Sequence, residues 1–157
     1  MDLIKIGKIV STHGIKGEVR ILSDFPFKSK VFVVGNKLII DNKSYEIKTY
    51  RVHKKFDMVT LDDYTDINEV LFLLKKDVYI DKNNLILDDD EVLDSDLISY
   101  KVFSNDGKEG IIKEIFMASP SNKIVRIMLD REYLIPYKLI KIDKNKKCVN
   151  VEIIDGM

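Results

Sequence analysis

The stretch IGKIVSTHGIKGEVRI, residues 6–21, holds two short runs of apolar and β-branched residues on either side of a glycine-containing turn. Gly14 and Gly17 supply backbone freedom at the point where the chain must reverse direction. The stretch therefore predicts two neighbouring strands, at residues 3–10 and 18–22, with both glycines as structural turn residues.

The same alternation of strands and turns continues toward residue 82. In YEIKTYRV, residues 45–52, side chains alternate with the period of two that a half-buried strand has. Residues 41–44, DNKS, have the composition of a hairpin turn. The other expected strands are short and apolar and lie at residues 31–34, 37–40, 58–61 and 78–80.

One segment of this region has a different period. Apolar residues fall at the spacing of one helical face at Ile67, Val70, Leu71 and Leu74. Asp66 stands where a side chain can cap the start of that helix, with Glu69 three residues later. Residues 1–82 are therefore predicted to form a six-stranded barrel with one short helix.

The distribution of charge predicts two domains. Residues 1–82 carry 15 basic and 12 acidic side chains, whereas residues 83–92 carry four acidic and no basic ones. Because a run of like charges repels itself and stays extended, residues 83–92 are predicted to be a linker. A solvated loop inside a single domain would have the same composition. In residues 93–157, about five short strands separated by turns predict a second small β-barrel or sandwich.

The composition narrows the classes of function. The 26 basic and 26 acidic residues cancel, so the chain has no global positive field of the kind that nonspecific nucleic-acid binders carry. The basic set is 22 Lys and 4 Arg, which favours a solvated lysine-rich surface over sequence-specific readout. No apolar run approaches the ~20 residues of a membrane helix. We expect a soluble, cytoplasmic monomer.

No combination of residues predicts covalent chemistry. The sequence lacks the motifs of serine hydrolases, zinc proteases, P-loop proteins and dinucleotide-binding proteins. Cys148 lies on an alternating strand, where a small buried hydrophobe is expected rather than a nucleophile. We expect no catalytic residue, no metal and no cofactor. A small enzyme remains the alternative that a deep pocket with clustered titratable groups would support.

Residues 6–21 also resemble the amino-terminal motif of the RimM family. The matching residues fall in register and are Gly7, Lys8, Ile9, His13, Gly14, Gly17 and Glu18. Two later stretches, residues 94–115 and 132–143, resemble the PRC barrel that forms the second module of the same family. The resemblance implies an all-β, non-catalytic protein. Its amino-terminal barrel would be six-stranded and similar to those of translation proteins, and its carboxy-terminal barrel would be a PRC barrel.

The resemblance further implies a ribosome maturation factor that binds the immature small (30S) subunit at its head and promotes 16S rRNA folding and processing. Its protein partner would be the nineteenth small-subunit ribosomal protein, with no membrane and no small-molecule substrate involved. The residues implied in partner binding are Val92, Leu93, Asp96, Leu97, Asn122, Lys123, Pro136 and Tyr137. Those implied near rRNA are Lys5, Lys8, His13 and Lys16.

For some of these residues a structural role is the alternative. His13 would then pack or cap its turn, and Leu97 would belong to the core. The chain also departs from the family pattern, with Val92-Leu93 in place of an aromatic pair, Ser99 in place of glycine and Lys123 in place of aspartate. A stand-alone RNA-binding barrel is the rival function, and it would need exposed aromatic side chains over a basic groove.

Overall fold

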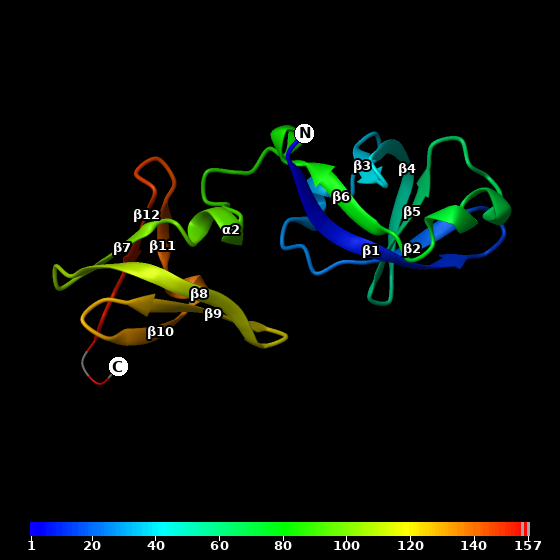
Figure 1. Cartoon of the computed structure of the whole chain (residues 1–157). Coiled ribbons are helices and arrows are strands. Elements are labelled where there is room, and N and C mark those ends of the chain that lie inside the picture. The colour runs from blue at the N-terminus through cyan, green and yellow to red at the C-terminus, as the bar shows by residue number, and fades with distance from the viewer. Residues whose placement is uncertain (155, 157) are drawn as a thin grey trace. The chain divides into compact units, whose positions relative to one another are not determined.

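The computed structural model describes residues 1–154 and 156 and divides the chain into two compact units, residues 1–86 and 87–157 (Figure 1). The last positions of the predicted second domain, 155 and 157, lie outside the described residues. Each unit is built mainly from β-strands, so the predicted all-β class with two small β domains is confirmed.

The first unit is a closed six-stranded barrel. Its strands are β1 (Leu3–His13), β2 (Glu18–Leu22), β3 (Lys37–Ile40), β4 (Lys43–His53), β5 (Phe56–Leu61) and β6 (Asp77–Asp81). They pair antiparallel in the closed order β1-β2-β5-β4-β3-β6. Burial alternates along β2 and β6, whereas β3 and β5 each bury three consecutive residues, and Ile9, Val19, Ile47 and Val59 are fully buried.

Two turns of this barrel have the backbone that their residues predict. Asp41 and Asn42 have φ of 51° and 63°, as a two-residue type I′ hairpin between β3 and β4 requires. Gly17 has φ of 84°, and a Cβ there would lie 3.1 Å from the carbonyl oxygen of Asp66. Gly17 therefore allows both the turn after β1 and the close approach of the segment around Asp66.

The predicted helix near residue 70 is wrong in type. The segment forms two 3₁₀ turns, η1 (Ile67–Glu69) and η2 (Leu71–Leu73), although Asp66 caps the first by accepting a 2.7 Å hydrogen bond from the Asn68 amide. The buried side chains are Val70 and Leu73, three residues apart, which is the 3₁₀ period, and Leu71 is 45% exposed. Apolar spacing alone did not separate the two helix types.

The predicted strand at residues 31–34 is also wrong. Lys28–Val31 forms the short helix α1, which buries Val31, and Val33 and Val34 beyond it are exposed. The first unit ends after β6 with the 3₁₀ turn η3 (Lys82–Asn84).

The second unit contains one six-stranded sheet. Its elements are α2 (Asp94–Leu97), β7 (Lys101–Ser104), β8 (Glu109–Ser119), β9 (Asn122–Met128), β10 (Glu132–Pro136), η4 (Tyr137–Leu139), β11 (Lys141–Asp143) and β12 (Cys148–Val151). The hydrogen-bonded order is β10-β9-β8-β7-β12-β11, with β7 and β12 parallel and the other pairs antiparallel. The sheet thus has one strand more than the five or so expected.

The core of the second unit is formed by apolar side chains from its strands, among them Val102, Ile127 and Val149. Gly110 lies where two strands approach closely, since a Cβ there would be 1.9 Å from the Met128 carbonyl oxygen. Cys148 is buried, as expected for a small hydrophobe.

Candidate nucleic-acid interface

Side chains from four adjacent strands gather positive charge on the outer face of the first barrel. In the strand order β1-β2-β5-β4, Val19 and Val59 point inward, so residues next to them in sequence lie on the opposite face, where Met58 is also fully buried. With the turn between β4 and β5, these outward residues form what we call the outer basic surface: His13, Arg20, Arg51, His53, Lys54, Lys55 and Phe56.

Direct contacts hold this surface together. The Nη2 atom of Arg20 lies 2.5 Å from Nδ1 of His13, and the rings of His13 and His53 have centroids 5.7 Å apart. Arg51 donates two hydrogen bonds to Glu18, from Nε to Oε2 at 2.8 Å and from Nη2 to Oε1 at 2.7 Å. This fork-like pairing fixes the guanidinium of Arg51 in one orientation across the strands.

The surface keeps an excess of positive charge. Glu18 offsets the charge of Arg51, while Arg20, Lys54 and Lys55 add three further cations. The Arg20 guanidinium lies 5.7 Å and the Lys55 ammonium 5.6 Å from the centroid of the Phe56 ring. Proteins that bind single-stranded nucleic acids contact the phosphates with cations and stack the bases on aromatic rings. The outer basic surface offers groups of both kinds.

The charges of the outer basic surface help to shift the pKa values of His53 and Glu18. Burial, followed by the charges of Arg51 and His13, lowers the pKa of His53 below its ordinary 6.5, so this ring is mostly neutral at pH 7. The hydrogen bond from Arg51 lowers the pKa of Glu18 below 4.5, so this carboxylate stays ionised. A phosphate placed near His53 would oppose the cations and favour protonation of the ring.

The four residues predicted to lie near rRNA do not form one site. His13 belongs to the outer basic surface, and Lys16 is exposed in the turn that follows it. Lys5 and Lys8 lie in the first half of β1 and line a separate hollow of about 550 Å³, and Lys5 forms an ion pair with Asp77 (Nζ to Oδ1, 3.3 Å). Strand β1 therefore contributes basic residues to two places on the barrel.

In the second unit, Lys123 connects β9 to α2 and to η4. Its Nζ lies 2.8 Å from Oδ1 of Asp94 and 4.2 Å from the centroid of the Tyr137 ring. Asn122 is exposed, and Pro136 and Tyr137 are partly buried beside Lys123. The lysine that replaces the family's aspartate is thus held by a carboxylate and an aromatic face.

The prediction that Val92, Leu93 and Leu97 face a partner is wrong. They are 3%, 6% and 0% exposed, and Val92 and Leu97 belong to the core of the second unit. Apolar side chains next to a short helix are more stable when they cover the sheet than when they meet water. The alternative that Leu97 belongs to the core is therefore confirmed.

The turn after α2 forms without the glycine that is usual in the family. Ser99 Oγ donates a 2.7 Å hydrogen bond to the backbone oxygen of Asp96, and the Ser99 amide bonds to the same oxygen at 3.2 Å. A serine hydroxyl can satisfy a carbonyl at a helix end, so a left-handed residue is not needed here. The partly exposed Asp96 lies directly before this turn.

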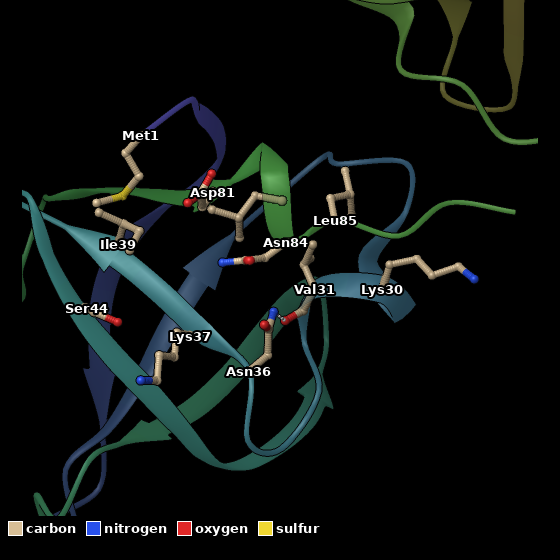
Figure 2. A pocket seen from close by; sticks show the side chains of 11 residues that line it. Met1, Lys30, Val31, Asn36, Lys37, Ile39, Ser44, Asp81, Asn84 and Leu85 are labelled. Atoms are coloured by element: carbon tan, nitrogen blue, oxygen red, sulfur yellow. Dashed lines mark hydrogen bonds between the residues drawn. The ribbon is translucent and has the colours of Figure 1, made fainter.

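A hollow of about 200 Å³ lies on the first barrel between α1, β3 and the segment after β6 (Figure 2). Asn36 spans one wall by donating a 2.7 Å hydrogen bond to the Val31 carbonyl oxygen, and Asp81 caps η3 through the Asn83 amide at 3.0 Å. Lys30 and Val31 on α1 also line the hollow (Figure 2). The polar groups of this wall thus serve the barrel's own backbone, and the volume is below the ~300–1,000 Å³ of small-molecule sites.

Within residues 1–154 and 156, no group of three or more His, Cys, Asp or Glu side chains is placed to hold a metal ion. In the same part of the chain, no helix is long and apolar enough to cross a membrane.

Sequence reasoning missed most of the outer basic surface. Arg20 and Arg51 are 31 positions apart, yet both pair in register with Met58, which is fully buried between them. The signal was present in part, since His53 and the two lysines after it lie between two predicted strands. The pairing of β2 with β5 was needed to bring those residues to the end of β1, where His13 lies.

The family model and the similar proteins all carry the name of one family. The RimM N-terminal domain family matches residues 4–85. The chain is 36% identical to the ribosome maturation factor RimM of Oceanobacillus iheyensis, covering 97% of this chain and 95% of that protein. It is 37% identical to the ribosome maturation factor RimM of Ligilactobacillus salivarius, covering 100% and 99%. The solution structure of the N-terminal domain of RimM from Thermus thermophilus is 19% identical with a TM-score of 0.49, covering 55% of this chain and 98% of that one.

Proposed function

Because the chain belongs to the RimM family, we propose that it is a ribosome maturation factor that acts on the immature small subunit in the cytoplasm. It would bind the head of the 30S subunit and promote folding and processing of 16S rRNA. The family consists of ribosome maturation factors, and none of the comparisons indicates an enzymatic family. The role therefore depends on binding rather than on bond-making.

The observation that carries the proposal is the outer basic surface of the first barrel. Its exposed cations include Lys54 and Lys55, and the Lys55 ammonium lies beside the Phe56 ring. Cations of this kind contact phosphates without reading sequence, which suits a factor that must recognise the shape of folding rRNA. Lys16 extends the same positive region along the turn after β1, and Lys5 and Lys8 supply a second contact on that strand.

The second unit would contact the nineteenth small-subunit ribosomal protein. The residues proposed for this contact are Asp96, Asn122, Lys123, Pro136 and Tyr137. Val92, Leu93 and Leu97 would support this surface from beneath. Lys123 would lie at the centre of this surface. The Asp94 carboxylate and the Tyr137 ring both restrict the position of its side chain.

Binding of this type can promote maturation without catalysis. A factor that binds a native-like arrangement of the subunit head better than a misfolded one shifts the population toward the native-like arrangement. A preference of tenfold corresponds to about 1.4 kcal/mol, which a few phosphate contacts can supply. The two units offer two such contacts on one chain.

The test is co-sedimentation of the purified chain with immature small subunits assembled with or without the nineteenth protein. The proposal predicts retention on the complete particles and clearly weaker retention on particles that lack that protein. Equal retention on both would mean that the nineteenth protein does not contribute to binding. No retention on either would overturn the proposed function.

Stand-alone binding of RNA is a second candidate, and the same outer basic surface favours it. In that case the first barrel would bind free single-stranded RNA, with an affinity that falls steeply as salt rises. The two candidates separate on one measurement, since only the ribosome maturation factor gains affinity when the nineteenth protein is present.

A further inference from the structure

A patch of exposed aromatic and aliphatic side chains lies on the first barrel near η1 and η2. Val70 and Leu73 are buried and anchor the segment, which leaves Leu71 45% and Phe72 53% exposed. Tyr64 contacts Phe72 edge-on, with ring centroids 6.2 Å apart and an interplanar angle of 83°. Neighbouring large apolar residues exposed on a structured turn are a candidate contact surface.

A third ring fixes this patch to the barrel. Tyr45 on β4 is only 5% exposed, and its ring centroid lies 6.5 Å from that of Tyr64 and 6.4 Å from that of Phe72. The three rings therefore form one cluster with its base in the barrel and its outer edge at Phe72.

The surroundings of the cluster are acidic. Residues 62–69, DDYTDINE, contain four carboxylates and no basic residue, and only the buried Val70 separates them from the exposed Leu71 and Phe72. Burial raises the pKa of Tyr45, and the neighbouring charges of Asp62 and Asp41 raise it further. The nearby Lys48 lies 2.6 Å from Glu46 and also interacts with Asp62 and Asp63, and Lys76 lies 2.8 Å from Asp41. Two cations among six carboxylates leave the surroundings with an excess of negative charge.

We infer that this acidic aromatic patch, formed by Tyr64, Leu71 and Phe72 with the carboxylates of residues 62–69, binds an extended Arg- and Lys-rich segment of a protein. Guanidinium and ammonium groups bind to aromatic faces and to carboxylates, whereas an RNA backbone would be repelled by four carboxylates. Basic protein arms of this composition are typical of proteins that bind nucleic acid. Charge complementarity therefore selects a basic peptide as the occupant.

The patch is structurally connected to the outer basic surface. The Ile67 amide donates a 2.9 Å hydrogen bond to the Ile15 carbonyl oxygen, and Asp66 packs against Gly17 in the turn after His13. One barrel thus offers an anionic aromatic site and a cationic site that share a turn. The inference deepens the proposed function and rests on it for the source of the segment, a basic arm of a protein in the assembling subunit.

The experiment follows amide resonances of the full-length chain by NMR during titration with a ten-residue Arg/Lys-rich peptide. The same peptide with glutamine at every basic position is the control, and a ten-residue oligouridine is the RNA probe. The inference predicts that the basic peptide shifts residues 62–73 and that the glutamine peptide does not. The RNA is expected to shift residues of the outer basic surface instead.

Two variants locate the contact. Phe72→Ser is expected to weaken the basic peptide about two- to fivefold, the range for an exposed cation–aromatic contact. Asp63→Lys reverses an exposed charge and is expected to weaken it between about twofold and thirtyfold at low salt. The matched controls Phe103→Ser and Asp24→Lys change exposed residues elsewhere and should leave the affinity unchanged.

The inference is overturned if the peptide leaves residues 62–73 unshifted, if oligouridine shifts them as strongly, or if both Phe72→Ser and Asp63→Lys bind the peptide like the unmodified chain. The titration contains no ribosomal component. Its failure would thus leave the co-sedimentation result, and the proposed function with it, unaffected.

Discussion

The double variant Lys54→Asn with Lys55→Gln removes two exposed cations from the outer basic surface. Lys54 has φ of 56°, a left-handed backbone that asparagine adopts more readily than most residues, so the hairpin between β4 and β5 is preserved. Neither lysine is buried, and the free energy of unfolding should change little. The variant therefore isolates the charge of the surface from its fold.

The size of the effect follows from counterion release. Each phosphate contact on single-stranded RNA contributes about 0.7 to the slope of log K against log salt, so losing two contacts lowers the magnitude of the slope by about 1.4. Between about 50 and 200 mM salt, the affinity ratio of the unmodified chain to the variant should shrink about sevenfold. Fluorescence anisotropy with a labelled single-stranded segment of 16S rRNA measures both slopes.

A matched control is available in the second unit. Lys146 and Lys147 lie in the turn between β11 and β12 and are exposed, and Lys147 has φ of 51°. Lys146→Gln with Lys147→Asn removes the same charge from an exposed turn between two antiparallel strands. If this control lowers the slope as much as the Lys54 and Lys55 variant, or if neither changes it, the assignment of rRNA contacts to the outer basic surface is refuted.

Three further outcomes are expected. Gly110→Ala should destabilise the second unit by at least about 2 kcal/mol in denaturant unfolding, since its Cβ would lie 1.9 Å from a carbonyl oxygen of the neighbouring strand. The control Gly107→Asn lies in an open turn and should lower the free energy of unfolding far less. Equal losses in the two variants would contradict the steric reason. Glu18 should titrate below 4.5 by NMR and return toward 4.5 in Arg51→Gln. The stability from this pair is thus present above pH 4.5 and is lost as pH falls through the lowered pKa, and an unchanged Glu18 pKa would exclude the ion pair as its cause. Lys123→Met should weaken binding to the nineteenth small-subunit protein several-fold while the fold is retained, and unchanged affinity would place that contact elsewhere.

Much of the fold was predictable because local residue chemistry determines it. The turn at Asp41-Asn42 and the strand pair around Gly14 and Gly17 follow from residues that tolerate positive φ between alternating runs. The type of the segment near Val70 was not predictable. The positions that are buried in this segment depend on which side chains pack against the barrel. A spacing of three residues between them is common to both helix types.

The candidate site was only partly predictable for a different reason. His13 was identified through its turn, but Arg20 and Arg51 meet only because β2, β5 and β4 are adjacent in the barrel. Strand order depends on long-range pairing and leaves little trace in local sequence. The burial of Val92 and Leu93 likewise depends on which side of the sheet α2 covers, and residue type alone favoured exposure no more than burial.

The central claim is that this chain promotes maturation of 16S rRNA, and the most direct test is the state of that RNA in cells depleted of the chain. Primer extension at the 5′ end measures the fraction of 16S rRNA that is still precursor in free small subunits. The account predicts that precursor accumulates on depletion and that the unmodified chain restores processing, with the Lys54→Asn/Lys55→Gln variant restoring it less well. A precursor fraction that does not change on depletion would contradict the account.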